Sequence, residues 1–370
     1  MINLHNTLLI SVFAVLLLCN ISIFAQGNEN KSTKTDDEYF FDVDEVKFEE
    51  AKLLKPEFHG NISFGAPFSD GLDEAEKDSS NVFKQTEVSL WFGVQILKNL
   101  SFFSELEIED GFDEYEIERF ALDWNIFNDR FVVRIGKFYY PFGIERFVEN
   151  PVNNKLISRP YPSIKIIPGT WSDEGLEVFG NVPLYYKTRL NYDFAATNGL
   201  DEKGEQQFED NNDNITLGGR LGLEILPDLE IGSSYSTGKY DDDEKYKVDF
   251  IGVDAFYRKG GFEVRGEYIR SNVEQSTADG GSLDRKGYYI QTSYQYSPDI
   301  NYLKYVEFVG RFDSVDPDDL VTDEDDADRI AFGINISPTN HIMLKLQYET
   351  ENAATEVREH KGFIQLNIRW

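Results

Sequence analysis

The chain ends with residues Lys361–Trp370, KGFIQLNIRW. Apolar and polar residues alternate here up to the final position: Ile364, Leu366, Ile368 and Trp370 form one set, and Gln365, Asn367 and Arg369 the other. A period of two places the two sets on opposite faces of a β-strand. Because the formal net charge of the chain is -31, an apolar stripe that reaches the last residue indicates a strand whose apolar face is covered.

Lipid is the environment that best explains such a final strand. A soluble sheet can end on a polar edge, whereas in lipid each unsatisfied backbone group costs several kcal/mol, so every strand must pair on both sides. We therefore expect the last strand to pair with the first one. This pairing closes a barrel and places Trp370 in an interfacial aromatic belt.

Alternating segments recur along the chain from residue 56 to residue 370. The clearest lie at residues 88–96, 215–225, 288–296 and 342–349. Short connections rich in Pro, Gly, Asn and Asp alternate with long polar ones, a rhythm typical of outer-membrane barrels. The pattern predicts an all-β fold, a transmembrane antiparallel barrel of about sixteen strands. Taken alone, the alternation also fits a soluble sandwich, such as a secreted β-rich binding protein.

The first 55 residues differ from the predicted barrel in composition. Residues 1–25 contain an apolar run from Leu8 to Leu18, which predicts a signal peptide and is short for a membrane-spanning helix. Residues 26–55 are polar and acidic and predict a flexible periplasmic leader. The single cysteine, Cys19, lies inside the signal and follows Leu18, where a lipoprotein signal needs a small residue. Because the predicted signal contains the only cysteine, we expect no disulfide in the mature chain.

Residues 141–172 separate two predicted strands by far more than a hairpin turn. Five prolines stiffen this segment: Pro141, Pro151, Pro160, Pro162 and Pro168. We expect it to fold into the lumen as a constriction loop. The loop and the preceding strand carry the basic residues Arg134, Lys137, Arg146, Lys155, Arg159 and Lys165. A ring of such cations is the usual construction of an anion pore, although the same residues could pair with neighbouring carboxylates or face the solvent.

Acidic residues also fall on predicted lumen faces. Glu105, Glu107 and Glu109 share the polar face of one strand, and other strands carry both carboxylates and arginines. A mixed lumen does not decide the sign of ion selectivity. The sequence therefore predicts a porin for passive diffusion of small hydrophilic solutes, phosphate or other anions among them, with a general non-selective or cation-preferring porin as the alternative.

Enzymatic and metal-binding functions find little support in the sequence. A barrel hydrolase needs a histidine near a nucleophile or a carboxylate, and only His59, His341 and His360 follow the signal. The segment DPDDLVTDEDDAD, within residues 312–328, lacks the glycine and closing glutamate of an EF-hand loop. We expect no enzyme activity, no cofactor and no bound metal. The strongly acidic composition gives no indication of nucleic-acid binding.

One region resembles a known family. The stretch RFVVRIGKFYYPFGIERF, residues 130–147, and the section with Pro168, Gly169, Asp173 and Gly175 resemble the porin O and porin P family of phosphate-selective porins. The resemblance covers residues 130–200 and implies a trimeric, sixteen-stranded diffusion channel in a Gram-negative outer membrane, surrounded by lipid and lipopolysaccharide. The terminal aromatic Trp370 is similar to the signal that such barrels present to the barrel assembly machinery. One departure is that Thr170 and Trp171 follow the Pro-Gly turn, where the family often has a basic residue.

Overall fold

The computed structural model describes residues 56–67, 85–109, 114–127, 129–147, 153–185, 187–201, 212–276, 281–318, 326–353 and 359–370. All of them belong to the compact unit Phe40–Trp370. The predicted signal peptide, residues 1–25, and the predicted leader, residues 26–55, lie outside the described residues. Within the described part of the chain, no helix has both the length and the apolar character needed to cross a membrane.

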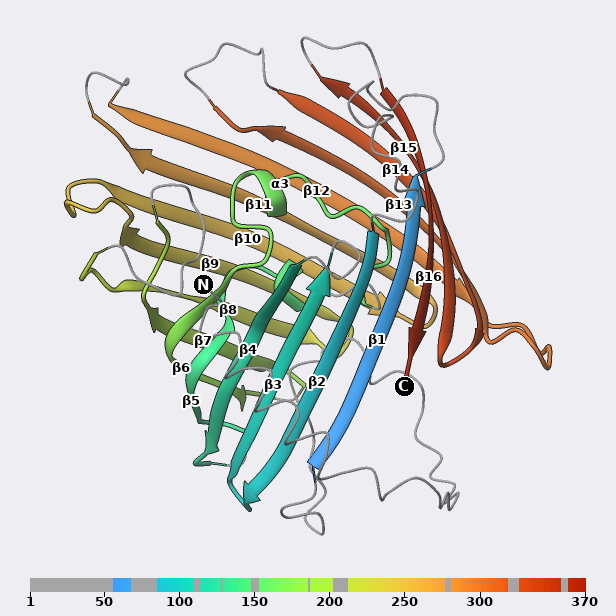
Figure 1. Ribbon diagram of the computed structural model, residues 1–370, viewed down its shortest axis with the longest axis horizontal. Coiled ribbons are helices and arrows are strands. Elements are labelled where there is room, and N and C mark those ends of the chain that lie inside the picture. Colours follow the sequence, from blue (N-terminus) through green and yellow to red (C-terminus); the bar gives the residue numbers. More distant parts are fainter. Residues whose placement is uncertain are drawn as a thin grey trace, which may run out of the picture. The chain divides into compact units, whose positions relative to one another are not determined.

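The described residues form an almost entirely β structure (Figure 1). Its strands are β1 (Pro56–Pro67), β2 (Gln85–Leu97), β3 (Leu100–Glu109), β4 (Glu114–Asn125), β5 (Val132–Tyr139), β6 (Ser172–Pro183), β7 (Arg189–Thr197), β8 (Thr216–Leu226), β9 (Leu229–Lys239), β10 (Lys247–Lys259), β11 (Phe262–Glu274), β12 (Ser282–Tyr296), β13 (Tyr305–Asp316), β14 (Ala327–Thr339), β15 (Ile342–Ala353) and β16 (Glu359–Arg369). Two short helical turns, η1 (Glu145–Phe147) and α3 (Pro162–Lys165), lie between β5 and β6.

Each strand pairs antiparallel with its neighbours in the chain, and β1 pairs with β16, so the sheet closes into a barrel. These sixteen described strands confirm the predicted fold class. Closure leaves no sheet edge unpaired, as a lipid environment requires.

Most strands carry apolar side chains outward and polar ones inward, apart from inward apolar residues on β10 and β11 such as Phe250 and Ile269. On β14, Phe332 is 61% exposed whereas its neighbour Ala331 is fully buried. Ile330 and Ile334 share the exposed face with Phe332, and Arg329 and Asn335 lie on the buried inner face. A soluble protein would cover the apolar face, so this arrangement fits a surface that lipid covers.

The ends of the chain segment that forms the barrel meet at β1 and β16. In the register, Ile62 pairs with Ile368 and Phe64 with Leu366. The Trp370 N–H donates to the Gly60 carbonyl at 3.0 Å, and the Gly60 N–H donates to the Trp370 carbonyl at 3.2 Å. The last residue therefore takes part in closing the ring, as its sequence pattern predicts.

Aromatic side chains border the outer apolar band at both of its ends. Tyr268 and Tyr288 pair directly across β11 and β12, and Phe262 pairs with Tyr294 near the opposite ends of the same two strands. All four side chains are well exposed. Such girdles at the two interfaces are typical of transmembrane barrels.

Candidate functional site

The segment between β5 and β6 turns into the barrel and returns to the neighbouring strand. We call residues 140–171 the constriction loop; residues 148–152 of it lie outside the described part. The Tyr140 N–H donates to the Trp171 carbonyl at 2.6 Å, which joins the two ends of the loop. The inward course of this loop confirms that part of the predicted fold.

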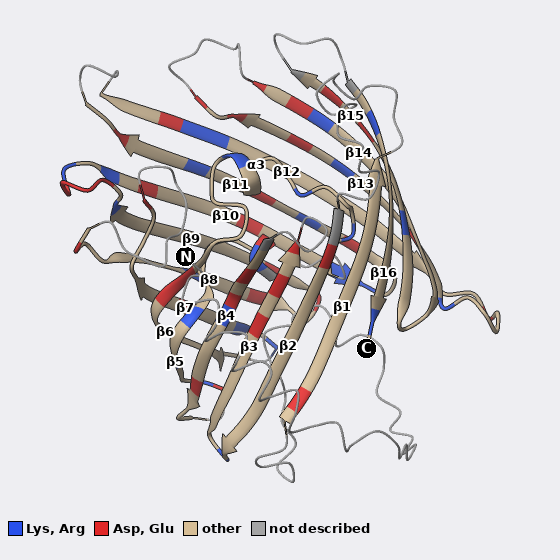
Figure 2. Ribbon diagram, in the orientation of Figure 1, with Lys and Arg blue, Asp and Glu red and all other residues tan. Residues whose placement is uncertain are grey.

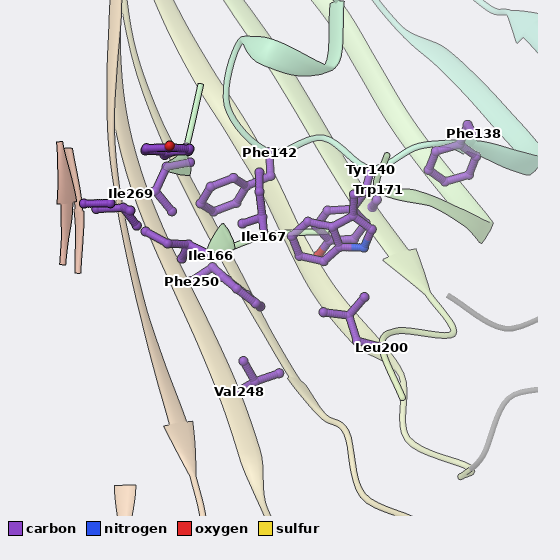
Figure 3. Packing of buried hydrophobic residues seen from close by; sticks show 14 residues of the cluster. Phe138, Tyr140, Phe142, Ile166, Ile167, Trp171, Leu200, Val248, Phe250 and Ile269 are labelled. Carbon is purple, nitrogen blue, oxygen red and sulfur yellow. The ribbon is translucent and has the colours of Figure 1, made fainter. Parts of the chain in front are cut away.

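An apolar anchor holds the base of the loop against the wall (Figure 3). The rings of Tyr140 and Trp171 stack with their centroids 4.1 Å apart, and the Phe250 ring of β10 meets Trp171 edge-on at 5.2 Å. The Phe142 ring packs beside the rings of Trp171 and Phe250. Ile166 and Ile167 of the loop belong to the same cluster as Val248 of β10 and Ile269 of β11. Aromatic pairs of this kind stabilise contacts beyond the area they bury.

Hydrogen bonds complete the apolar anchor. The Tyr140 hydroxyl shares a 2.9 Å hydrogen bond with the Ser236 hydroxyl of β9, and burial raises the pKa of the Tyr140 hydroxyl above its ordinary value. Gly143 adopts a φ of +67°, a region that favours glycine, and its N–H donates to Ser234 Oγ at 3.0 Å. The loop therefore turns sharply while its backbone stays bonded to the wall.

A polar anchor holds the middle of the loop on β13, β14 and β15. The N–H groups of Ile157 and Ser158 donate to Gln347 Oε1 at 2.5 and 3.2 Å. Arg311 donates to the Ser158 carbonyl at 2.7 Å. The Tyr161 N–H donates to Asp313 Oδ1 at 3.1 Å. These bonds satisfy loop backbone groups that a buried loop would otherwise leave unpaired.

Arg329 connects this polar anchor to the tyrosine ring of the loop. Its guanidinium lies 3.8 Å from the centroid of the Tyr161 ring and also donates to the Arg159 carbonyl. Asp313 accepts hydrogen bonds from both Arg311 and Arg329 at 2.9 Å. Burial raises the pKa of the Tyr161 hydroxyl above its ordinary value, against the effect of the nearby arginine. The hydroxyl group therefore stays neutral beside a buried cation.

Lys155 and Leu156, in the middle of the loop, add a charged contact and an apolar contact with the wall. Lys155 Nζ lies 3.0 Å from Glu263 Oε2 and donates to Ser293 Oγ at 2.9 Å and to Glu307. The neighbouring Leu156 is buried against Val309 and Ala331. Both contacts direct the loop toward the wall of β11–β14.

The basic residues predicted for an anion path lie close to carboxylates at several positions. Arg134 donates to Asp123 at 2.7 and 2.9 Å and to Glu177 at 2.9 Å. Its guanidinium carbon lies 4.8 Å from the centroid of the Phe103 ring and 4.7 Å from that of the Phe179 ring. Arg146 contacts Glu177 at 3.5 Å and also pairs with Asp193.

The other three predicted cations have different surroundings. Lys137 follows Gly136, whose φ is +133°, and its Nζ lies 2.9 Å from Glu116 Oε1. Arg159 donates to the Gly169 carbonyl within the loop. Lys165 is exposed, with its Nζ 4.6 Å from the centroid of the Tyr161 ring. Arg134 and Arg146 meet at Glu177, whereas the other four have separate partners. The role of the six cations as an anion path stays a prediction.

The predicted lumen carboxylates share the inner face of β3. Glu105 accepts from Arg119 Nε at 2.6 Å and from the Tyr139 hydroxyl at 3.1 Å. Glu107 accepts from Ser89 Oγ at 3.2 Å. Glu109 is exposed at the end of the strand. Their contribution to the pore also stays a prediction.

Sequence reasoning missed the wall residues that hold the loop. Asp313, Arg329 and Gln347 were not singled out, although each occupies an inward position of an alternating strand. The alternation of inward and outward residues along each strand could have identified these three as inner-face residues. It could not have identified the loop residues that they contact.

Among the described residues, the histidines lie apart from one another and no metal site is found. β1 and β16 are neighbours, but their register pairs Asn61 with Arg369 and Pro67 with Phe363, which places His59 and His360 toward opposite ends. His360 Nδ1 lies 2.8 Å from the Tyr348 hydroxyl. In the part of the chain that the structure covers, no group of three or more His, Cys, Asp or Glu side chains is arranged to hold a metal ion.

A closed barrel of this size, with a polar interior and an inward loop, defines the class of porin folds. Comparison with solved structures supports this class. The chain is similar to OmpF of Salmonella typhi, with a TM-score of 0.61 and 13% identity over 86% of this chain and 98% of the other. It is also similar to an anion-selective porin of Comamonas acidovorans, with a TM-score of 0.57 and 14% identity over 85% of this chain and 98% of the other.

A trimer form of OmpT, an outer membrane protein of Vibrio cholerae, matches with a TM-score of 0.58 and 9% identity over 86% of this chain and all of the other. At such identities these likenesses show the fold alone. No protein-family model matches the chain, so the resemblance to phosphate-selective porins is not confirmed. An uncharacterized protein of Aquifex aeolicus is 25% identical over 256 residues, 60% of this chain. The match spans 58% of that protein's length.

Proposed function

We propose that the protein is an outer-membrane porin through which small hydrophilic solutes diffuse passively. The observation that carries this proposal is the inside-out sheet: exposed apolar residues such as Phe332 alternate with inward polar residues such as Arg329 around a closed ring. A lumen lined in this way holds water, and the constriction loop narrows it. Transport then depends on the width of the lumen and on its fixed charges.

The six basic residues predict, in addition, selectivity for phosphate or other anions. Such selectivity requires that their positive charges act on the solute in the lumen. Arg134, Lys137, Arg146 and Lys155 each lie within ion-pair distance of a carboxylate, which reduces the net charge they present.

One observation favours the alternative of a non-selective or cation-preferring porin. Among the buried charged side chains of the described strands and loop, acidic residues outnumber basic ones. The acidic ones are Glu105, Glu107, Glu118, Glu145, Asp173, Glu177, Glu230, Asp254, Glu263, Glu267, Glu307, Asp313 and Glu349, and the basic ones are Arg119, Arg134, Lys137, Arg220, Arg265, Arg311, Arg329 and Lys345.

The proposal includes an assembly and a location. We assign the protein to the outer membrane of a Gram-negative type of cell, in contact with lipid and lipopolysaccharide, as a homotrimer. The trimer form of the similar Vibrio cholerae structure supports the oligomeric state. Trp370, at the closing seam, is the residue we propose the barrel assembly machinery reads. We assign no catalytic activity and no cofactor.

Two measurements on the detergent-purified, full-length protein test the proposal. Reconstituted vesicles should swell in isosmotic solutions of small sugars and fail to swell with large ones, and planar bilayers should show discrete conductance steps. Electrophoresis with and without boiling establishes beforehand that the barrel is folded. A folded barrel that gives neither swelling nor conductance steps would refute the porin.

A further inference from the structure

Figure 2 shows bands of acidic residues on β2, β3 and β4, and the strand register places several of them on the inner face of the barrel. We use the name acidic wall for the described inner-face carboxylates Glu87, Glu105, Glu107, Glu109 and Glu116. Arg119 pairs with Glu105 at 2.6 Å, and Lys137 of β5 pairs with Glu116 at 2.9 Å. The five carboxylates outnumber these two cations, so the net charge of this group is negative.

Register and hydrogen bonding bring several of these carboxylates close together. Glu107 and Glu116 are directly opposite each other in the pairing of β3 with β4. Like charges in that position destabilise a sheet. Ser89 Oγ lies 3.1 Å from Glu87 Oε1 and 3.2 Å from Glu107 Oε1. A hydroxyl has one proton and can donate to only one of these two carboxylates at a time.

The neighbouring strand β1 places polar groups beside this pair. Asn61 is opposite Ser89 in the register, and Ser63 is opposite Glu87. Both side chains are fully buried, and neither the Asn61 amide nor the Ser63 hydroxyl has a hydrogen-bond partner among the described residues. Buried polar groups normally find a partner. An amide oxygen, a hydroxyl and two carboxylates together suit a cation with its water shell.

The loop contacts described above fall on a different part of the wall, on strands β6, β7 and β9–β15. Basic side chains of that part are held beneath or against the loop: Arg311 and Arg329 bond its backbone, Lys345 donates to the Asn154 carbonyl, and Arg265 lies 3.6 Å from Glu145. The loop cations Arg146 and Lys155 also point to carboxylates there. Docking of the loop thus engages basic side chains of β11 and β13–β15, while the acidic wall lies on β2–β4.

We infer that solutes pass the constriction along the acidic wall and that the favoured solutes are small cations: hydrated monovalent metal ions and small organic ammonium ions. This inference rests on the proposed porin and specifies its substrate class. No group of described carboxylates is arranged to hold a bare metal ion. The wall therefore attracts cations without binding them tightly, as conduction requires.

Reversal potentials in a KCl gradient across a planar bilayer test this inference, with tetramethylammonium chloride as a second salt. The wild-type protein should pass cations in preference to chloride. A carboxylate about 7 Å from a passing ion changes the ion's local concentration about threefold in water before salt screening. The double variant Glu87→Gln/Glu107→Gln should therefore lower the cation-to-anion permeability ratio by about threefold or more.

The matched control is Asp328→Asn, which makes the same chemical change on the outward face of β14, where Asp328 is exposed. It should leave the permeability ratio unchanged. Glu116→Gln, at a side chain that is 55% exposed, is a second lumen variant in case the double variant does not fold. Selectivity should also weaken between about 0.1 M and 1 M salt, because the screening length falls from about 10 to 3 Å.

The outcomes separate the inference from the function on which it rests. Conductance steps with anion preference, or with cation preference that the lumen variants do not lower, would overturn the acidic wall as the solute path and leave the porin intact. A folded protein without conductance steps would refute the porin and the inference together. Cation preference that falls in the lumen variants and persists in Asp328→Asn supports the assignment.

Discussion

Replacing Trp171 by alanine should release the constriction loop from the wall while leaving the barrel folded. The Trp171 side chain is 5% exposed and contacts the rings of Tyr140, Phe142 and Phe250. Truncation of a buried aromatic side chain costs about 3–5 kcal/mol. The barrel hydrogen bonds do not involve this side chain, so we expect the cost to fall on docking of the loop.

That free energy sets the size of the expected effect. Because each 1.4 kcal/mol is about a factor of ten in an equilibrium, the fraction of molecules with an undocked loop base should rise by roughly a hundredfold or more. The polar anchor at Ser158 and Tyr161 stays in place, so the loop should fluctuate without leaving the lumen. Single-channel recordings should show larger and noisier conductance, and limited proteolysis should cleave the loop faster.

Trp124→Ala is the control, because it removes the same side chain from a position where it is 52% exposed. It should change neither the conductance nor the cleavage of the loop. Electrophoresis without boiling verifies that both variants form barrels. If a folded Trp171→Ala protein has the conductance, the current noise and the protease resistance of the wild type, the aromatic contacts do not hold the loop.

Three further substitutions test other parts of the structure. Phe332→Arg puts a charge in the middle of the outer apolar band and should lower the free energy of unfolding in lipid vesicles by about 2–4 kcal/mol, against about 0–1 kcal/mol for Asp328→Arg at the end of the same strand; equal urea midpoints would contradict a lipid-facing Phe332. In Gly60→Ala the new Cβ would lie 2.2 Å from the Trp370 ring, so we expect a loss of about 1–3 kcal/mol and a lower yield of folded barrel on unboiled gels, whereas Gly169→Ala, with its nearest atom 4.0 Å away, should fold normally. Arg329→Met breaks a buried ion pair with Asp313 and should cost about 3–5 kcal/mol in urea unfolding. Lys286→Met breaks a pair with Asp316 at an exposed lysine and should leave the urea midpoint almost unchanged; similar losses in the two variants would show that the loop anchor adds no stability.

The barrel itself was predictable from the sequence because the period of alternation is a local property. Residues 364–370 alone show which side chains share a face. The length of the segment 141–172 indicates an inward loop in the same local way. Both expectations are confirmed by the closed sheet and by the course of the loop.

Only the tertiary structure decided which charges meet. Lys155 donates to Glu307, 152 positions away in the chain, and Arg134 to Glu177, 43 positions away. No local pattern specifies such partners, since they depend on the register of closure and on where the loop folds. Alternation also fails where the backbone departs from a regular strand, as at Gly136, between Arg134 and Lys137.

The physical reason for this division is the range of the forces involved. Hydrophobic periodicity follows from the geometry of a strand and needs only neighbouring residues. The net charge of a lumen depends on which residues closure of the barrel brings together. An ion pair cancels much of the charge that either residue would present alone. The sequence therefore determined a barrel with an inward loop, and the folded chain decided which charged side chains of the wall the loop contacts and which carboxylates gather on β2–β4.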